Sequence, residues 1–367
     1  MKKQKNTRIL IIFIAGIGDV ILFTPVLNGL MKHYKDCEIS VIVPPELASC
    51  AGKIPCFNDV VISETSGEHG LLKRIIQLAG LCIFVLKKNF DIVITPLAVN
   101  CATASLISRL SRAETKIGYT GSNESRTPFT ESINIMPFEH DMIQNLKVLE
   151  RLHISPPDKK MEFYISDTDR EDAAVFLKDN GISDKDTLVA FHPVTYDRKG
   201  YNRNWPADKY AGLGRRICRE YGAKIIILGS AGERKAAEEI KAVIGDRAIV
   251  QSGKTSIHAA AATLERCKLL VCNDSSIMHI GAAIGVPMVA IWGPTDPRRR
   301  GHSGRDQVVI RKELPCSPCR ESLKNCETRE CLTQIPVEEV FESCSEILSG
   351  KREKQITRDA DFSDASR

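Results

Sequence analysis

The chain has 367 residues, of which 43% are hydrophobic and 26% are charged. At roughly 150 residues per domain, this length predicts two or three domains, each large enough to bury a core without staples. Such a composition excludes disorder for the bulk of the chain. The 51 basic and 46 acidic residues give a net charge of +5, which is too small an excess to indicate a nucleic-acid partner.

Cysteine content and hydropathy limit the cellular setting. The 13 cysteines are an odd number without secretory spacing, which argues against a disulfide framework and indicates reduced thiols in a cytosolic protein. The apolar run Ile9–Ala15 follows a basic N-terminus, but it is short and no cleavage site follows it, so we interpret it as a buried strand. No stretch reaches the roughly 20 apolar residues of a membrane span.

Short runs rich in isoleucine and valine predict strands that are buried on both faces of a parallel sheet. In the first half these are Arg8–Ile14, Glu38–Val43, Asp59–Ile62, Asp91–Thr95 and Lys116–Tyr119. Helices are predicted at Pro25–Tyr34, His69–Lys87 and His140–His153. The segment Ser155–Lys160 contains prolines and charges and is the predicted linker.

The second half repeats this alternation. Its predicted strands are Thr187–His192, Ala223–Leu228, Ala248–Gln251, Leu269–Asn273, Met288–Trp292 and Val308–Ile310. Its predicted helices are Asp167–Asn180, Pro206–Tyr221, Glu233–Ile244, Ser256–Arg266, Ser276–Ile284 and Val337–Leu348. The pattern predicts a second doubly wound α/β domain. We therefore expect domains over residues 1–160 and 161–350, and a disordered tail over residues 351–367.

Ligands of open α/β sheets bind at the carboxyl ends of the strands. Gly16-Ile17-Gly18-Asp19 directly follows the first predicted strand, and glycine allows a close approach of the backbone to a ligand, which makes Gly18 a candidate nucleotide-binding residue. The dinucleotide fingerprint is not met, because residue 21 is isoleucine. Asp19 has two open roles: it accepts a proton from a hydroxyl, or it caps a helix. Thr24-Pro25 indicates that the helix starts or kinks there.

Three further strand-end motifs carry polar residues. Asp274, Ser275 and Ser276 are helix N-cap types ahead of His279, and this helix start suits a diphosphate; the alternative is a well-capped helix with an incidental histidine. Arg203 can hold two phosphate oxygens in its planar fork. Glu233 can bind ribose hydroxyls or sit in the first turn of a helix.

Gly293–Arg300 is a loop after a strand end, and it opens a basic patch that suits a phosphorylated or acidic substrate, or is simply solvated. The patch comprises Arg298, Arg299, Arg300, His302 and Arg305. Cysteines cluster soon afterwards, at Cys316, Cys319, Cys326 and Cys331. Four thiols can bind zinc tetrahedrally, in which case the site is structural. Two disulfides, an iron–sulfur cluster and reduced thiols are the alternatives.

Taken in order, these motifs resemble glycosyltransferase family 9, the bacterial heptosyltransferases that build the inner core of lipopolysaccharide. The resemblance spans Arg8–Gly350 and is carried by Arg8–Leu27, His140–Leu152, Trp205-Pro206, Gly229–Glu233, Asn273–Gly285 and Trp292–Pro297. It implies the GT-B fold, in which two Rossmann-like domains face each other across a cleft. It also implies inverting transfer of L-glycero-D-manno-heptose from ADP-heptose to a Kdo or heptose hydroxyl of a lipid A carrier.

Roles of single residues follow from the same resemblance. It implies that Asp19 is the base, that Arg203 touches phosphate and that Glu233 lies near the ribose. It also implies contacts to the nucleotide sugar from Asp274, Ser275, Ser276 and His279. No Asp-x-Asp motif is placed to carry a metal, so we expect that no cofactor is required.

Some positions depart from the family pattern. Ser275-Ser276-Ile277 stands where the family has Thr/Ser-Gly-Pro, Arg203 replaces a lysine, and Phe13 stands where a basic residue is common. These departures leave two alternatives open: a related transferase that uses another nucleotide sugar, or a non-catalytic protein that binds one.

A lipid acceptor implies a cytoplasmic protein that is peripheral on the inner face of the bacterial inner membrane. Leu71–Lys88 has basic residues beside apolar ones and is the candidate membrane contact. The alternative for this segment is an ordinary helix that packs on the sheet.

Overall fold

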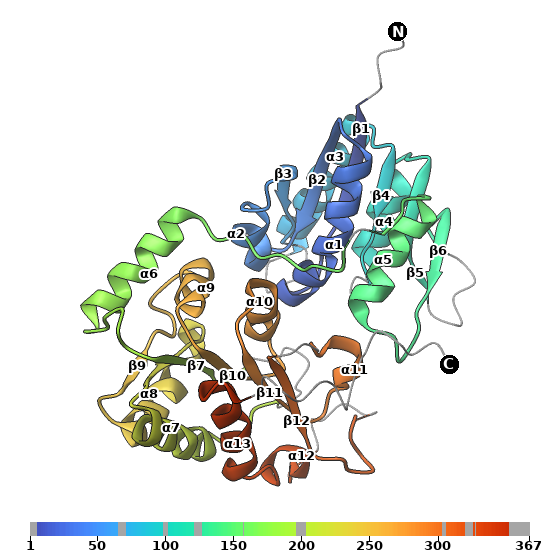
Figure 1. The fold of residues 1–367 in the computed structure, drawn as a ribbon. Coiled ribbons are helices and arrows are strands. Elements are labelled where there is room, and N and C mark those ends of the chain that lie inside the picture. The colour runs from blue at the N-terminus through green and yellow to red at the C-terminus, as the bar shows by residue number, and fades with distance from the viewer. Residues whose placement is uncertain are drawn as a thin grey trace. The chain divides into compact units, whose positions relative to one another are not determined.

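Each of two structural units is built around one parallel sheet. The computed structural model describes residues 6–64, 71–97, 102–120, 127–156, 158–195, 203–302, 306–319, 326 and 328–351. Contacts divide the chain into unit 1, Met1–Tyr164, and unit 2, Ile165–Arg367, and each unit holds a six-stranded sheet (Figure 1). The predicted tail lies outside the described residues, apart from Lys351.

In unit 1 the strand order is β3-β2-β1-β4-β5-β6. The strands are β1 Thr7–Ile12, β2 Cys37–Val43, β3 Phe57–Ile62, β4 Ile92–Ile94, β5 Thr115–Thr120 and β6 Glu131–Asn134. The helices are α1 Ile17–His33, η1 Pro45–Leu47, α2 Ala48–Ala51, α3 Leu71–Lys88, α4 Ala102–Leu110 and α5 Asp141–Arg151. Strand β6 was not predicted, because its sequence is polar and only half-buried and lacks the apolar run of the other strands.

Side chains of β1 alternate between the two faces of this sheet, as strand geometry requires. Ile9 and Ile11 belong to the cluster that packs against α1 and α5, whereas Leu10 and Ile12 pack with residues of α3 and α4. All four are fully buried. Both faces are therefore covered, which explains why β1 is an uninterrupted apolar run.

Helix α1 corrects a predicted boundary. It begins at Ile17, eight residues before the predicted start at Pro25, and Pro25 lies inside it. Proline has no N–H, so the carbonyl of Ile21 loses its helical donor. The hydroxyl of Thr24 donates to that carbonyl at 2.7 Å and accepts the N–H of Glu162 at 2.9 Å. Thr24 thus compensates for the proline, and the helix continues to His33.

In unit 2 the strand order is β12-β11-β10-β7-β8-β9. The strands are β7 Leu188–His192, β8 Lys224–Ile227, β9 Ala248–Val250, β10 Leu269–Asn273, β11 Met288–Trp292 and β12 Gln307–Arg311. The helices are α6 Asp167–Asp179, α7 Ala207–Tyr221, η2 Ala231–Glu233, α8 Arg234–Ile244, α9 Ile257–Glu265, α10 Ser276–Ile284, α11 Pro297–Arg300, α12 Glu330–Thr333 and α13 Val337–Leu348.

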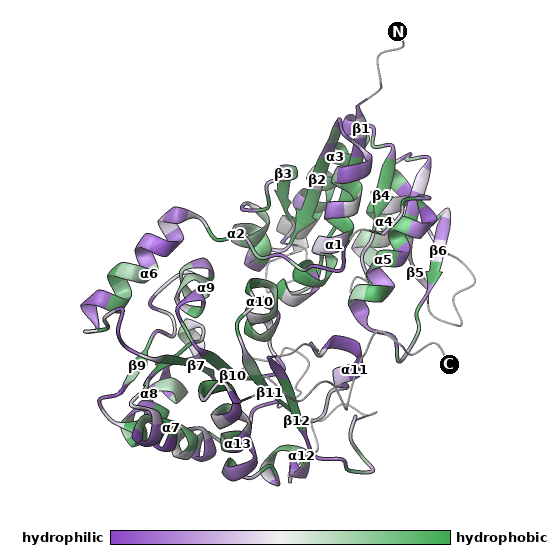
Figure 2. Ribbon diagram, viewed as in Figure 1, coloured by the Kyte–Doolittle hydropathy of each residue, from purple (hydrophilic) through white to green (hydrophobic). Residues whose placement is uncertain are grey.

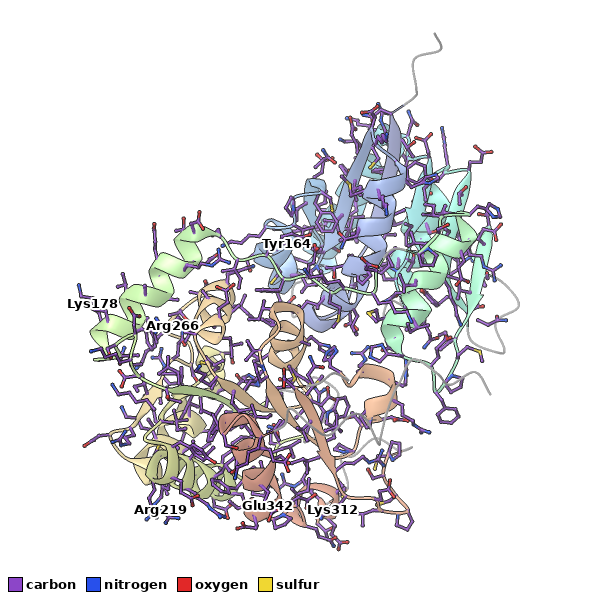
Figure 3. The ribbon with its side chains drawn as sticks, in the orientation of Figure 1. Tyr164, Lys178, Arg219, Arg266, Lys312 and Glu342 are labelled. Atoms are coloured by element: carbon purple, nitrogen blue, oxygen red, sulfur yellow. The ribbon has the colours of Figure 1, made fainter. Side chains whose placement is uncertain are left out.

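Strands β7, β10 and β11 of unit 2 are apolar, while helices such as α6 and α7 carry many polar residues (Figure 2). Lys178 of α6, Arg219 of α7 and Glu342 of α13 are exposed at the outside of the unit (Figure 3). Among the described residues, no helix is long and apolar enough to cross a membrane.

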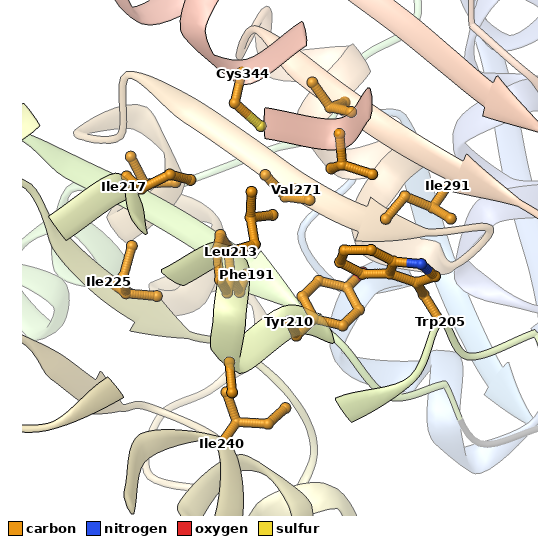
Figure 4. Close-up of a cluster of buried hydrophobic side chains, with 14 of the residues drawn as sticks. Phe191, Trp205, Tyr210, Leu213, Ile217, Ile225, Ile240, Val271, Ile291 and Cys344 are labelled. Atoms are coloured by element: carbon orange, nitrogen blue, oxygen red, sulfur yellow. The ribbon is translucent and has the colours of Figure 1, made fainter. Parts of the chain in front are cut away.

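An aromatic cluster anchors the segment that precedes α7 (Figure 4). The ring of Trp205 lies edge-on to Tyr210 with 5.1 Å between centroids, and Tyr210 lies 5.5 Å from Phe191 of β7. The indole N–H of Trp205 donates to the carbonyl of Ile335 at 3.1 Å. Because Trp205 is only 1% exposed, it fixes the chain that brings Arg203 to the end of the sheet.

Candidate active site

Asn273 ties two strand ends together at the carboxyl edge of the unit 2 sheet. It is the last residue of β10 and is fully buried. Its amide Nδ2 donates to the carbonyl of Pro193, just after β7, at 2.8 Å. Its Oδ1 accepts the N–H of Trp205 at 3.1 Å and the hydroxyl of Tyr210 at 3.3 Å. The connection from β7 to α7 is thereby held against β10.

Asp274, the next residue, joins three strand-end loops. Its Oδ2 accepts Nη1 of Arg203 at 3.0 Å and the hydroxyl of Thr295 at 2.8 Å. The side chain of Asp274 is 5% exposed and that of Arg203 is 23% exposed. Arg203 and Asp274 were predicted as separate ligand contacts, and the structure pairs them. Thr295 was not predicted as a site residue. The sequence feature that could have identified it is its place in the turn after β11, a strand that ends at the same edge.

Helix α10 begins directly after Asp274 and presents its N-terminus. Ser275 is the N-cap residue, but its hydroxyl makes no capping hydrogen bond. Within the described residues that Oγ is buried and has no hydrogen-bond partner. Ser276 is half-buried and is the first residue of the helix. The first N–H groups of a helix and its dipole favour an anion, so this end of α10 suits a phosphate.

His279 is buried on α10 and is not an isolated histidine. Its Nδ1 lies 2.8 Å from Nε2 of His302, which follows α11, and the two ring planes are 89° apart. His279 is 3% exposed and His302 is 7% exposed. A residue of the β11–β12 connection therefore engages the ring of His279, and the contact of His279 with a nucleotide sugar stays a prediction.

Half-buried Glu233 and buried His192 form a second pair in this unit. Oε2 of Glu233 accepts the N–H of Ser230 at 2.6 Å and lies 3.9 Å from Nε2 of His192. Burial lowers the pKa of His192 below its ordinary value, against the opposing attraction of the Glu233 carboxylate. The imidazole is therefore neutral at neutral pH.

Gly229 leaves room for this carboxylate, because a Cβ there would lie 2.9 Å from Oε2 of Glu233 and from Oγ of Ser252. Of the two roles left open for Glu233, the structure displays the turn-capping one. Its contact with ribose stays a prediction.

Gly18 and Asp19 belong to unit 1. Gly16 is the N-cap of α1, Gly18 is buried in the first turn, and Oδ2 of Asp19 accepts the N–H of Gly16 at 2.8 Å. Asp19 thus caps the helix, which was one of its two predicted roles. The same hydrogen bond fixes the carboxylate in one orientation. The second role of Asp19, as a base, stays a prediction.

The predicted basic patch is partly neutralised. Asp296 caps α11 and also binds the guanidinium of Arg298, with 2.6 Å between Oδ2 and Nη2. Burial would raise the pKa of Asp296, but its hydrogen bonds from Arg298 and the positive charge outweigh this and hold the pKa below its ordinary value. Arg298 therefore serves its own loop, and Arg305 lies outside the described residues.

The cysteine segment packs on the Gly293-Pro294 turn. The hydroxyl of Ser317 donates to the carbonyl of Gly293 at 2.8 Å, and the N–H of Cys319 donates to that of Pro294 at 2.7 Å. Burial, followed by the charges of Cys326, Cys316 and Cys319, raises the pKa of Cys331 to about 11. The described cysteines are free thiols, and no three or more histidine, cysteine or acidic residues in the described part are arranged to hold a metal.

With this geometry in place, comparison with known proteins decides the family. The sequence profile of glycosyltransferase family 9 (heptosyltransferase) matches residues 84–329. The chain belongs to glycosyltransferase family 9. Lipopolysaccharide heptosyltransferase 2 of Salmonella typhimurium is 23% identical over 303 residues, covering 79% of this chain and 84% of that protein. The family makes the protein a glycosyltransferase and confirms the resemblance predicted from the motifs.

Solved structures of family 9 share the fold. The family 9 glycosyl transferase of Veillonella parvula has a TM-score of 0.80 at 24% identity, covering 95% of this chain and 99% of that one. E. coli ADP-heptose LPS heptosyltransferase II has a TM-score of 0.74 at 19% identity, covering 94% and 99%. With the two parallel sheets, these likenesses confirm the predicted GT-B fold class.

Replacing Asp274 tests the tie between the strand-end loops. Asp274→Asn removes the ion pair between Asp274 and Arg203, and we expect unit 2 to lose about 1–3 kcal/mol of unfolding free energy. The loss stays below the roughly 3–5 kcal/mol of a fully buried pair because Arg203 retains access to water. Urea unfolding measures it. Asp184→Asn, in the exposed Arg266–Asp184 pair, is the control and should cost less than about 1 kcal/mol; equal losses would contradict the tie.

Proposed function

We propose that this glycosyltransferase moves heptose from ADP-heptose to a Kdo or heptose hydroxyl of the lipopolysaccharide inner core, with inversion at C1. The names of the Salmonella relative and of the E. coli structure give lipopolysaccharide and ADP-heptose, and the Kdo or heptose hydroxyl comes from the family resemblance. The observation that carries it is the start of α10, where an unpartnered buried hydroxyl on Ser275 accompanies a helix N-terminus. A site of this kind suits a diphosphate better than a neutral ligand.

Donor binding follows from the strand-end geometry of unit 2. The diphosphate lies on the first turn of α10, where the N–H groups of Ser275 and Ser276 and the Ser275 hydroxyl donate to its oxygens. Arg203, held by Asp274, adds positive charge beside it. These donors are in place before the reaction and stabilise the charge that develops on departing ADP. The Glu233 carboxylate accepts from the ribose hydroxyls, and His192 beside it stays neutral.

Inversion requires a single displacement at C1. The acceptor oxygen attacks C1 on the face opposite to ADP, the C1–O bond to phosphate breaks, and the acceptor proton passes to a base. Asp19 is that base in our proposal, and Gly18 lies in the same turn. The N–H of Gly16 holds Oδ2 of Asp19 in one orientation, which limits the motion of the carboxylate. Catalysis by such a base contributes about 10²–10⁴-fold.

The variant Asp19→Asn distinguishes the two roles of Asp19, as a base and as a helix cap. The amide oxygen of asparagine still accepts from Gly16, so the fold is retained while the proton acceptor is lost. We expect turnover to fall by about 10²–10⁴-fold with ADP binding nearly unchanged. The assay is ADP release from ADP-heptose with a heptose-free lipid A–Kdo acceptor.

Asp36→Asn, at an exposed aspartate of the same unit, is the matched control and should keep full turnover. Undiminished turnover in Asp19→Asn would remove Asp19 from the chemistry. A wild-type protein that binds ADP but releases none from ADP-heptose would favour another nucleotide sugar or a non-catalytic binder.

We further propose a cytoplasmic location with peripheral membrane contact through α3. One side of this helix packs on the sheet through Leu81 and Val85. Elsewhere it leaves Leu72, Ile75 and Ile76 exposed by 72%, 54% and 62%. An amphipathic helix with apolar residues outside and basic residues at its end suits the surface of an anionic bilayer.

Removing two of these apolar side chains tests the membrane contact. The double variant Leu72→Ser/Ile76→Ser should bind vesicles of anionic phospholipid roughly tenfold more weakly or worse, because it loses the apolar area that enters the interface. Vesicle flotation measures the binding. Val175→Ser/Val243→Ser removes exposed apolar residues from unit 2 and should float like the wild type. Equal flotation of the two double variants would exclude α3 as the contact.

The four cysteines are not assembled into a metal site in the described structure, so a structural metal there, the last element of the proposal, has to draw them together. Its support is the spacing of four cysteines within 16 residues, because four thiolates can bind zinc tetrahedrally. No catalytic step involves it. Elemental analysis of the purified protein should find about one zinc, or the iron of a cluster, per chain. Cys331→Ser should lose the metal and Cys82→Ser should keep it. A metal-free wild type whose four thiols all react would contradict the site.

A further inference from the structure

We propose that His302 is a positioning residue for the nucleotide-sugar donor, and that it acts by setting the tautomer of His279. This inference rests on the proposed function, in which α10 binds the diphosphate. The residues come from different connections of unit 2: His279 lies on α10, and His302 follows α11. Their facing nitrogens are 2.8 Å apart, which is hydrogen-bond distance.

The geometry of the two rings makes this contact a directed hydrogen bond. The planes are 89° apart with 4.8 Å between centroids, so one ring presents its edge to the other and they do not stack. Both side chains are buried, at 3% and 7% exposure. A buried imidazole nitrogen that lacks a partner is unfavourable, so the pair is a specific feature of the site.

A neutral imidazole carries one proton on one of its two nitrogens. If Nε2 of His302 donates, Nδ1 of His279 accepts, and the proton of His279 must then lie on its Nε2. If Nδ1 of His279 donates instead, its Nε2 holds only a lone pair, which repels a phosphate oxygen. The proposal places the diphosphate at Nε2 of His279, so only the first arrangement makes His279 a donor toward it, and we assign that arrangement to the protein.

His302 thus acts on the donor through His279. The hydrogen bond to a partner fixes which nitrogen of a histidine is protonated, as it does for histidines that bind metals. Because His302 follows the loop that carries Thr295 and Asp296, the alternative is that it only braces this loop. A brace would affect stability, whereas a tautomer effect would also appear in the nitrogen spectrum and depend on a donor at position 302.

Three variants distinguish these roles. His302→Leu keeps an apolar side chain but has no donor. His302→Gln keeps an N–H that can donate to Nδ1 of His279. His258→Leu removes another buried histidine of unit 2, on α9, and controls for the loss of a buried ring. The measurements are the Kd for ADP by calorimetry, the thermal midpoint, and ¹⁵N spectra of the His279 ring in the ligand-free protein.

The wild type should show His279 protonated at Nε2 before any ligand is added. In His302→Leu this tautomer should lose its dominance, and the Kd for ADP should rise roughly tenfold or more, as expected for loss of a hydrogen bond to a charged group. His302→Gln should restore the tautomer and most of the affinity, and His258→Leu should leave both unchanged.

Two results would overturn the proposal. One is a wild-type His279 protonated at Nδ1. The other is a pair of His302 variants that bind ADP alike, whether with wild-type affinity or with the same loss. Failure of the proposed function is a separate result, because a wild type that does not bind ADP would refute nucleotide binding while the spectra still report the tautomer.

Discussion

The carboxylate of Asp274 is the interaction on which the candidate site depends. A buried carboxylate is unfavourable unless charge and hydrogen bonds compensate it, and here Arg203 and Thr295 both bind the same oxygen. Arg203 follows β7, Thr295 follows β11 and Asp274 follows β10. The buried carboxylate is therefore compensated only when these three loops come together. Asn273, one residue earlier, also joins separate segments, through hydrogen bonds with Pro193 and Trp205.

Polar groups concentrate at this edge because the rest of the sheet excludes them. Strands β7, β10 and β11 are buried throughout, so their side chains contribute packing and little chemistry. Where each strand ends, the packing constraint is relaxed, and polar residues appear in buried or half-buried pairs. These pairs, which lie at strand ends or in the segments that follow them, are Arg203–Asp274, His192–Glu233 and His279–His302. Their mutual bonds hold them in fixed orientations, as a preorganised site requires.

Much of this arrangement could be predicted from sequence. The bounds of β10, β11, α10 and α13 agree with the prediction at both ends, because each is a clear apolar pattern bounded by turn or capping residues. The start of α1 was missed because proline usually marks a first turn, and no local rule reveals that the Thr24 hydroxyl compensates for it. Partners such as Thr295 and His302 were hidden for another reason. Their bonds join segments far apart in sequence, and only the strand order places those segments together.

The loop after β11 is also held by contacts with segments that are distant in the sequence. Thr295 binds Asp274 on one side, while the carbonyls of Gly293 and Pro294 accept from Ser317 and Cys319 on the other. Gly293 must be glycine here, since a Cβ would lie 2.6 Å from the buried side chain of Leu332 on α12. Residues that follow β12 therefore contact the loop on one side, and Asp274 contacts it on the other. A loop held on both sides is already ordered in the folded protein. A ligand that binds beside it therefore loses little binding free energy to ordering the loop.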